Sequence, residues 1–338
     1  MKNLNLWNNQ LCQPVLITYN RAKKLEQTLS AFYEIADTGI QLHILDNAST
    51  DETPQIVAAW QEKWKNLFYH RNLFNLGGNA NILRALEISQ SKYSWIIGDD
   101  DLWHLQHLPL LIAALAVEDV DIFRLGWLTP EYTQGKKSSA RQLATEESLF
   151  FASLGMISST IIRRSIMANY LPQAYMNIAN AYPQLVAPIL ALQQGDLLVY
   201  SLEQPLLTHT PSQEPAYYFG DLEWYAGWFK TGKFFDNNRL RQKFLSEIVR
   251  YMIRPTSGYW AEWVWLLKVS LNYKAQGVRQ GYHLAELFLY GTGWRFRLLL
   301  LNILYGLFPG FLANWLRKLY YKGQGKKAPT LKIDRSRI

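Results

Sequence analysis

The first 125 residues alternate short apolar runs with stretches of helical periodicity. Runs rich in β-branched and aromatic residues, a pattern typical of buried strands, lie at residues 13–19, 41–45, 67–70, 93–97 and 121–125. Between these runs apolar residues recur at helical spacing, as Leu25, Leu29 and Phe32 do. A chain that alternates strand and helix folds into a mostly parallel sheet with helices on both faces. We therefore predict an α/β fold for this part of the chain.

Polar clusters directly follow the predicted strands. These clusters are Tyr19-Asn20-Arg21, Asp46-Asn47, residues 75–78 and Asp99-Asp100-Asp101. Because the carboxyl ends of parallel strands share one edge, we expect the clusters to converge where open α/β sheets bind ligands. The sequence therefore predicts a ligand site at this edge of the sheet.

Three consecutive acids close the fourth predicted strand. Asp99, Asp100 and Asp101 repel one another unless a positive charge lies beside them. A divalent cation such as Mg²⁺ suits that place, because hard cations prefer carboxylate oxygens. A solvated acidic turn is the alternative that these residues alone leave open.

The glycine patterns of the familiar phosphate-binding loops are absent. Neither GxGxxG after the first strand nor GxxxxGK[ST] occurs. We therefore expect the ligand to be recognised by carboxylates and amides, with a metal bridging its phosphates. Asp46 is placed to accept hydrogen bonds from a base or ribose, and Arg21 or Arg84 to pair with phosphate oxygens. Each arginine is equally well explained as a surface residue of a helix.

Four blocks of sequence between Pro14 and Trp103 resemble, in order and separation, the family 2 glycosyltransferases of the GT-A fold. The blocks are residues 15–21, 45–51, 75–81 and 98–101. The resemblance implies a GT-A, Rossmann-like sheet, a nucleotide-diphosphate sugar as the sugar donor, and a divalent metal ion, Mn²⁺ or Mg²⁺. The sequence Asn-Ala-Ser-Thr-Asp at 47–51, combined with Gly-Asp-Asp-Asp at 98–101, looks like the branch that includes abequosyltransferases of O-antigen synthesis.

The resemblance also implies which residues bind the sugar donor and the metal. For the sugar donor they are Thr18, Tyr19, Asn20, Arg21, Asp46, Asn47, Ser49, Asn75, Gly78, Asn81, Arg84 and Asp99. For the metal they are Asp100, Asp101 and His209. Gly98 stands where the family has the first acid of its DXD motif, and Asp100 aligns with the last one. We expect Asp99 to supply the missing carboxylate.

The general base is not identified by the sequence. Residues 151–164 resemble the acceptor-side strand of the family, after which an acidic pair commonly provides the base. The corresponding place here, residues 177–184, contains no carboxylate, although a sugar hydroxyl is a poor nucleophile until it is deprotonated. Weak candidates elsewhere are Glu146, Glu147, Asp196 and Glu203, and each is more readily explained as a surface acid.

The C-terminal third differs in composition from the rest of the chain. The formal net charge is +8, and basic and aromatic residues gather towards the C-terminus, which favours a membrane surface or an anionic substrate over nucleic acid. Residues 298–316 carry no charge but are interrupted by Asn302, Gly306, Pro309 and Gly310. This pattern predicts a helix pair lying in the membrane interface, with a spanning helix or a buried helical bundle as alternatives.

The remaining sequence features concern the compartment. The single cysteine, Cys12, excludes an intramolecular disulfide, suits a reducing cytoplasm, and is expected to be a small buried residue. The N-terminus lacks the apolar segment of a signal peptide. We therefore expect a cytoplasmic protein that lies peripherally on an inner membrane.

We predict three regions and one function. Residues 1–215 form a GT-A domain, with a donor half at 13–126 and an acceptor half at 127–215. Residues 216–321 form a Trp-rich, helical, membrane-associated region, and 322–338 a basic tail. The predicted enzyme moves a sugar, with inversion, to a lipid-linked saccharide during synthesis of a surface polysaccharide such as O-antigen or capsule. The alternative is a non-catalytic nucleotide-sugar-binding or assembly protein that has lost the base.

Overall fold

The structure is a computed structural model, and its chain divides into two compact units. It describes residues 6–126, 135–208, 221–252, 266–267, 270–271, 274–275, 281–290, 295–323, 325 and 327. One unit comprises residues 1–178 and 183–212, and the other comprises 179–182 and 213–338.

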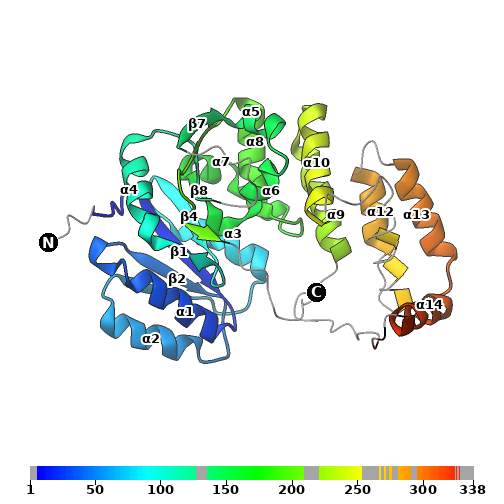
Figure 1. The fold of residues 1–338 in the computed structure, drawn as a ribbon, viewed down its shortest axis with the longest axis horizontal. Helices are drawn as coiled ribbons and strands as arrows, with labels where there is room; N and C mark the ends of the chain where they lie inside the picture. Colours follow the sequence, from blue (N-terminus) through cyan, green and yellow to red (C-terminus); the bar gives the residue numbers. More distant parts are fainter. Residues whose placement is uncertain are drawn as a thin grey trace. The chain divides into compact units, whose positions relative to one another are not determined.

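The first unit is built on an eight-stranded sheet with the strand order β3-β2-β1-β4-β8-β6-β9-β7 (Figure 1). The strands are β1 Cys12–Thr18, β2 Leu42–Asp46, β3 Leu67–Arg71, β4 Tyr93–Ile97, β6 Ile122–Arg124, β7 Lys136–Ser139, β8 Thr160–Arg163 and β9 Leu198–Ser201. Strands β1 to β4 are parallel to one another. Strand β8 is antiparallel to both β4 and β6, so β6 runs in the direction of β4. Strand β9 is parallel to β6, and the edge strand β7 is antiparallel to β9.

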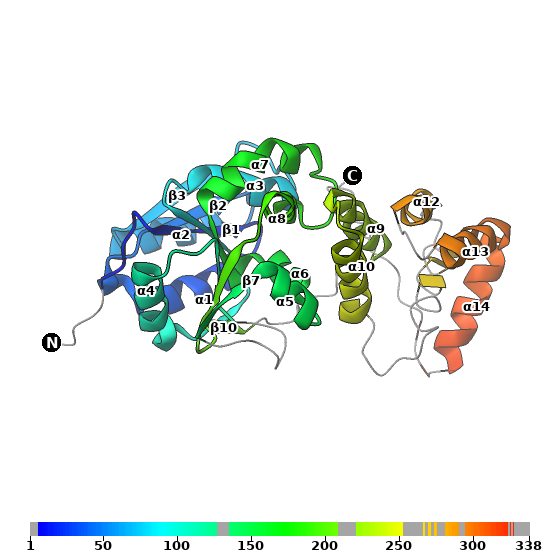
Figure 2. The ribbon, with the colours of Figure 1, turned by 90° about the horizontal axis from the view of Figure 1, so that it is seen from above.

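Helices cover both faces of this sheet. They are α1 Ala22–Tyr33, α2 Thr53–Lys63, α3 Gly78–Ile88, α4 Leu108–Val117, α5 Ala140–Glu146, α6 Phe150–Gly155, α7 Arg164–Met176 and α8 Val186–Gln194, with short 3-10 turns at Ala36–Thr38, Leu105–His107, Ile157–Ser159 and Pro183–Leu185. Helices α3 and α7 lie on one face, and α1 and α4 lie on the other (Figure 2). The predicted α/β fold with a mostly parallel sheet is therefore confirmed.

The prediction for residues 151–164 is wrong in part. Only Thr160–Arg163 form a strand, whereas Phe150–Gly155 form helix α6 and Ile157–Ser159 a 3-10 turn. A short apolar run does not distinguish a buried strand from a buried helical turn, because both are apolar at every position. The helix turns Met156 and the following residues back towards the carboxyl end of β4, where they line a pocket.

The core lies between the sheet and the helices, and Trp95 of β4 is at its centre. Trp95 is fully buried, and its ring packs against Trp7, Phe32 and Trp103. Its indole Nε1 donates a hydrogen bond to the carbonyl of Ser158 at 3.0 Å. Trp103 belongs to β5 (Leu102–Trp103), which pairs with β10 (Leu207–Thr208) in a small antiparallel sheet. The packing thereby fixes the segments just beyond β4 that carry the candidate site.

Cys12 is a buried residue at the start of β1. It is fully covered, and burial raises the pKa of its thiol well above the ordinary range. A covered thiol of raised pKa forms little thiolate and is unreactive. The predicted structural role of Cys12 is confirmed.

The described part of the second unit is helical. Its helices are α9 Asp221–Thr231, α10 Asn238–Met252, α12 Gly281–Tyr290, α13 Arg295–Leu307 and α14 Gly310–Gly323, with a 3-10 turn at Gly232–Phe234. Trp228 of α9 is buried, stacks on Phe244 at 4.2 Å between ring centroids, and donates to the Phe244 carbonyl. Tyr182 meets the same indole edge-on. Lys230 pairs with the buried Glu286 of α12 at 2.7 Å.

The apolar stretch at 298–316 forms two helices instead of one. Helix α13 ends at Leu307 and α14 begins at Gly310, on either side of Pro309, which disfavours continuation of a helix through the residue before it. Among the described helices, none alone combines the length and the apolar composition needed to cross a bilayer. The segments Leu299–Leu307 and Gly310–Gly323 meet that criterion only as a pair, with a bend of 97° between them.

Candidate functional site

The parallel strands bring the predicted polar clusters to one edge. Thr18 at the end of β1 is in register with Asp46 at the end of β2, and Leu16 is in register with Ile97 of β4. The backbone N–H of Asn47 donates to the Thr18 carbonyl at 3.0 Å, which continues the pairing beyond the strands. The residues after β1, β2 and β4 therefore share one side of the unit, as the sequence predicts.

Asp99 is the buried centre of a charged cluster after β4. Its side chain accepts hydrogen bonds from Thr18 Oγ1 at 2.7 Å and from Arg21 Nη1 at 2.9 Å, one on each carboxylate oxygen. Thr28 of α1 donates to the Asp99 carbonyl. Burial raises the pKa of Asp99, although Arg21 and Thr18 both favour its charged form. Both carboxylate oxygens are already bonded, so Asp99 holds Thr18 and Arg21 in place.

Arg21 joins this cluster through a single nitrogen. Its Nη1 atom lies 2.9 Å from Asp99 Oδ1 and 2.8 Å from Asp100 Oδ2. Although burial alone lowers the pKa of Arg21, the charges of Asp99 and Asp100 raise it above its usual range. Arg21 is thus a fixed positive charge within the acidic cluster, and the alternative interpretation as a surface helix residue does not describe it.

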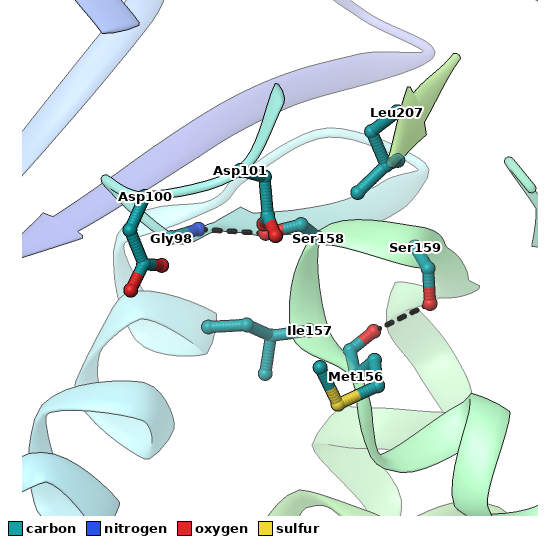
Figure 3. A pocket seen from close by; sticks show the side chains of 8 residues that line it. All are labelled: Gly98, Asp100, Asp101, Met156, Ile157, Ser158, Ser159 and Leu207. Carbon is teal, nitrogen blue, oxygen red and sulfur yellow. Dashed lines mark hydrogen bonds between the residues drawn. The ribbon is translucent and has the colours of Figure 1, made fainter. Parts of the chain in front are cut away.

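A pocket of about 90 Å³ lies beside the aspartates (Figure 3). It is lined by Gly98, Asp100, Asp101, Met156, Ile157, Ser158, Ser159 and Leu207. The backbone N–H of Gly98 donates to Ser158 Oγ at 2.8 Å, which connects the end of β4 to the turn before β8. Pockets that enclose a whole small ligand have roughly 300–1,000 Å³. A ligand of that size would therefore place only one part in this pocket.

Gly98 provides room at the position where the family has an acid. A Cβ atom at Gly98 would lie 3.4 Å from both Asp100 Oδ1 and Ser158 Oγ, and 3.7 Å from Asp101 Oδ2. A side chain at Gly98 would therefore begin in van der Waals contact with the carboxylates of Asp100 and Asp101. Asp99 does not fill this space, because its carboxylate is held by Thr18 and Arg21 instead.

Asp46 lies at the centre of a second, closed network. Fully buried, it accepts hydrogen bonds from the backbone of Ser49 at 2.9 Å, from the Tyr69 hydroxyl at 2.7 Å and from Arg71 Nε at 3.2 Å. Burial, followed by the bond to Asp46, raises the pKa of Tyr69. Tyr69 and Arg71 are absent from the predicted site. The signal that identifies them is the register of β3, in which Ile44 faces Tyr69 and Asp46 faces Arg71.

Asparagine side chains hold the loop between β3 and α3. Asn72 donates to the side-chain oxygens of Asn47 and Asn81, both at 2.9 Å, and Asn47 donates to Asn75 at 2.7 Å. The Asn47 oxygen also accepts the backbone N–H of Leu76. These bonds explain why amides cluster here, and they bring three of the predicted residues together. Gly78 is the first residue of α3.

The turn after β1 is connected to the turn after β2. Ser49 Oγ accepts the backbone N–H of Asn20 at 2.9 Å, and Asn20 Oδ1 accepts that of Thr50 at 2.7 Å. Asn20 adopts the left-handed conformation with φ 51°, which asparagine tolerates better than most residues. Tyr19, partly buried, precedes it. The predicted residues of the first two turns are thus adjacent.

Other predicted residues lie away from the pocket or outside the described chain. Arg84 is exposed on α3, where its charge adds to burial in lowering the pKa of His70. The four base candidates do not line the pocket: Glu147 is buried against Arg124 at 2.9 Å, Glu146 accepts from Gln142, Asp196 accepts the backbone N–H of Arg141, and Glu203 lies against Gly135. His209 lies outside the described residues.

The carboxylates of the pocket fit one kind of metal site. Asp100 and Asp101 line it, and among the described residues no group of three or more His, Cys, Asp or Glu side chains could hold a metal ion. Mg²⁺ is usually bound by one or two carboxylates together with substrate phosphates and water. The residues therefore fit a metal shared with a diphosphate and do not fit an all-protein metal centre.

Comparison with known proteins agrees with this geometry. Residues 15–168 match the family model described as Glycosyl transferase family 2. Abequosyltransferase RfbV from Salmonella typhimurium is 35% identical over 97 residues, which are 28% of this chain and 29% of that protein. This chain therefore spans less than a third of the length of that curated relative.

Two solved structures share the fold. TarS 1-349 from S. aureus in complex with UDP-GlcNAc has a TM-score of 0.54 and 14% identity, covering 94% of this chain and 92% of that one. Mannosyltransferase PcManGT from Pyrobaculum calidifontis, in complex with GDP-Man and Mn²⁺, has a TM-score of 0.52 and 14% identity, covering 88% and 87%. At this identity the similarity concerns the fold alone, and it confirms the predicted GT-A fold.

Proposed function

Because residues 15–168 of this chain match the model of Glycosyl transferase family 2, we propose that the protein is a glycosyltransferase that transfers a sugar from a nucleotide-diphosphate sugar to an acceptor hydroxyl. The observation that carries the proposal is the convergence of Arg21, Asp46 and Asp100 at one sheet edge beside a pocket. The sugar nucleotides bound to TarS and to the Pyrobaculum mannosyltransferase support the choice of substrate.

Asp100 and Asp101 are the residues that we assign to a divalent metal, Mn²⁺ or Mg²⁺. When bound, the metal neutralises the leaving diphosphate. The chain supplies fixed groups around the metal. Arg21 faces the negative charge of the diphosphate, and Asp99 holds Arg21 in place. The closed network of Asp46, Tyr69 and Arg71 presents a rigid surface for the nucleoside. Mn²⁺ in the Pyrobaculum structure supports the metal.

The wall of the pocket points to a deoxyhexose as the transferred sugar. Met156, Ile157 and Leu207 are apolar, and Ser159 Oγ already donates to backbone carbonyls. A sugar hydroxyl placed against Met156, Ile157 and Leu207 loses its water without gaining a partner. A methyl or methylene edge does not have this cost. The abequosyltransferase among the relatives is consistent with this class of sugar.

We place the acceptor at a membrane. Helices α13 and α14 expose large apolar side chains, including Leu307, Phe311 and Trp315 at 77%, 78% and 56% exposed. Such faces suit the interface of a bilayer, where a lipid-linked saccharide presents its hydroxyl. We also propose that the chain divides into regions at residues 215 and 321, and that it lies peripherally on the cytoplasmic face of an inner membrane. There it would act in surface polysaccharide synthesis and transfer the sugar with inversion.

One observation favours a second candidate, a non-catalytic nucleotide-sugar-binding protein. The described carboxylates that line the pocket are Asp100 and Asp101, and both are assigned to the metal. A separate base is therefore not visible in the described part of the pocket. A protein that retains the sugar-donor site without a base would bind a sugar nucleotide and transfer nothing.

A donor-hydrolysis assay tests the proposal. The full chain is incubated with sugar nucleotides carrying uridine, guanosine, thymidine or cytidine, with Mn²⁺, Mg²⁺ or EDTA, and with membrane extract as acceptor. We expect metal-dependent release of a nucleoside diphosphate from one of them. Binding in calorimetry without release in any condition would favour the non-catalytic candidate. Matched pairs such as GDP-mannose and GDP-D-rhamnose test the sugar class, with about a 10–100-fold higher kcat/KM expected for the 6-deoxy member.

Membrane fractionation tests the location. Deleting residues 294–338 removes α13 and α14 and should move the protein from the membrane pellet to the supernatant. A full chain that already remains in the supernatant without detergent would exclude the membrane assignment.

A further inference from the structure

The aspartate cluster contains its own cation. Arg21 Nη1 lies within 2.9 Å of a carboxylate oxygen on both Asp99 and Asp100, and Lys24 Nζ is 4.0 Å from the same Asp100 oxygen. The side chain of Asp100, the residue assigned to the metal, is 25% exposed. The carboxylate that would bind a metal is therefore already paired within the chain.

Arg21 is held at this position by more than Asp100. Asp99 is buried, and Thr18 bonds its other oxygen, so the Asp99 carboxylate keeps one orientation. The bond from Arg21 to Asp99 therefore persists whether or not Asp100 turns away. A guanidinium fixed in this way remains charged at any physiological pH. Its charge is a constant feature beside Asp100, which lines the pocket.

A divalent ion bound to Asp100 would be repelled by the positive charge of Arg21. Two like charges a few ångströms apart near a protein surface repel strongly, because the effective dielectric constant there is well below that of water. The repulsion disappears when a diphosphate adds negative charge beside both cations. Metal and diphosphate should therefore bind better together than either does alone.

We infer that Arg21 is a built-in counter-cation of the aspartate pair that makes metal binding dependent on the sugar donor. This inference rests on the proposed function, since it assigns the metal to Asp100. Arg21 acts here as a positioning residue: it weakens binding of the metal alone and favours binding of the metal and the diphosphate as a unit. By linkage, the metal then strengthens binding of the diphosphate by the same factor.

Binding of Mn²⁺ alone to the full chain, measured by electron paramagnetic resonance or calorimetry, tests the inference without turnover. The variant Arg21→Gln removes the charge and keeps hydrogen-bonding groups. We expect it to bind Mn²⁺ about tenfold more tightly than the parent, within the 5–150-fold range of coupled sites. Lys24→Gln should give a smaller gain, and Arg21→Lys, which keeps the charge, should resemble the parent.

A matched control is Arg163→Gln, because Arg163 also bridges two aspartates, Asp119 and Asp121, but neither of these aspartates lines the pocket. Its Mn²⁺ affinity should equal that of the parent. Thermal unfolding checks that each variant is folded; if Arg21→Gln is not, the comparison of Lys24→Gln with the parent decides. Unchanged or weaker Mn²⁺ binding in the charge-removing variants would overturn the inference, as would equal gains in Arg21→Lys and Arg21→Gln. Absent donor hydrolysis would instead count against the proposed function.

Discussion

Two arginine–carboxylate clusters lie at the same edge of the sheet and differ in what they leave exposed. In the parallel half, Arg21 contacts Asp99 and Asp100, and Asp100 reaches the pocket. In the other half, Arg124 at the end of β6 pairs with Glu147, and the two side chains are only 3% and 5% exposed. A covered pair contributes to the fold, whereas a carboxylate that reaches a pocket is available to a ligand. We therefore propose that accessibility, more than charge, separates structural from functional acids at this edge.

Asp100→Ala tests the accessible cluster and should have the largest effect. Removal of the carboxylate assigned to the metal should lower metal-dependent donor hydrolysis by roughly 10²–10³-fold or more, as loss of a single electrostatic group does in other enzymes. The free energy of unfolding should change by less than about 1 kcal/mol, since Asp100 is a partly exposed partner. Asp119→Ala removes an exposed acid elsewhere and should leave turnover unchanged. Normal activity in Asp100→Ala would exclude the site assignment.

Glu147→Gln tests the covered cluster. It removes the carboxylate that pairs with the buried Arg124, so we expect a loss of about 3–5 kcal/mol in the free energy of unfolding, measured with urea. The neighbouring Glu146→Gln is the control, because Glu146 is exposed and its change should stay within about 0.5 kcal/mol. Folded Glu147→Gln should retain donor hydrolysis. If the variant instead folds normally and loses turnover, the Glu147 carboxylate takes part in catalysis, and the contrast between the two clusters is wrong.

Asp46 is intermediate between the two clusters. Its carboxylate is fully buried, but its partner Arg71 keeps 48% of its side-chain surface exposed. Asp46→Ala leaves the Tyr69 hydroxyl and the Ser49 N–H without an acceptor, which should cost about 1–3 kcal/mol of unfolding free energy. The pKa of Tyr69 should fall towards its ordinary value, although burial keeps part of the increase. Ultraviolet titration of the phenol measures this, and an unchanged pKa would show that Asp46 does not control it.

The sequence predicts those features that depend on residues close together along the chain. The strands β1 to β4 each carry their own polar turn, so strand periodicity and the turn residues together placed Thr18, Asp46 and Asp100 at one edge. Their exposure was not predictable, because burial depends on packing against distant segments. The turn that completes the pocket, at Met156 to Ser159, comes from a stretch whose apolar run resembled a strand.

Residues that reach the site from a neighbouring strand are not predicted from the sequence, because their position depends on how the strands pair. Tyr69 and Arg71 reach Asp46 only because β3 pairs with β2 in one register, and a shift by one residue would turn both away. The sequence identifies Arg21 as a phosphate-binding candidate, but its bonds to two aspartates require the folded position of α1. Arg124 and Glu147 are ordinary charges in the sequence, and only their burial shows that they are a pair.

The smallest effect on stability should come from a pair of histidines with lowered pKa values, on the strands that also carry Asp46 and Arg71. His43 of β2 and His70 of β3 approach to 3.0 Å, and burial, with a contribution from His70, lowers the pKa of His43 to about 4. The unfolded chain, with a pKa near 6.5, then binds a proton that the folded chain does not. Stability should therefore rise as pH increases from about 4 to 6.5.

His43→Phe removes this proton uptake and retains the stacking on Phe68, whose ring lies 4.9 Å away. We expect the difference in unfolding free energy between pH 4.5 and pH 7.5 to shrink by about 1 kcal/mol, a value reduced for the partial exposure of the site. Urea unfolding at both pH values measures it. Because His43 does not contribute to the pocket that Asp100 and Asp101 line, Mn²⁺ affinity should be unchanged. A pH dependence identical to that of the parent would assign the acid sensitivity to other groups, with the charged clusters at the sheet edge as the first to test.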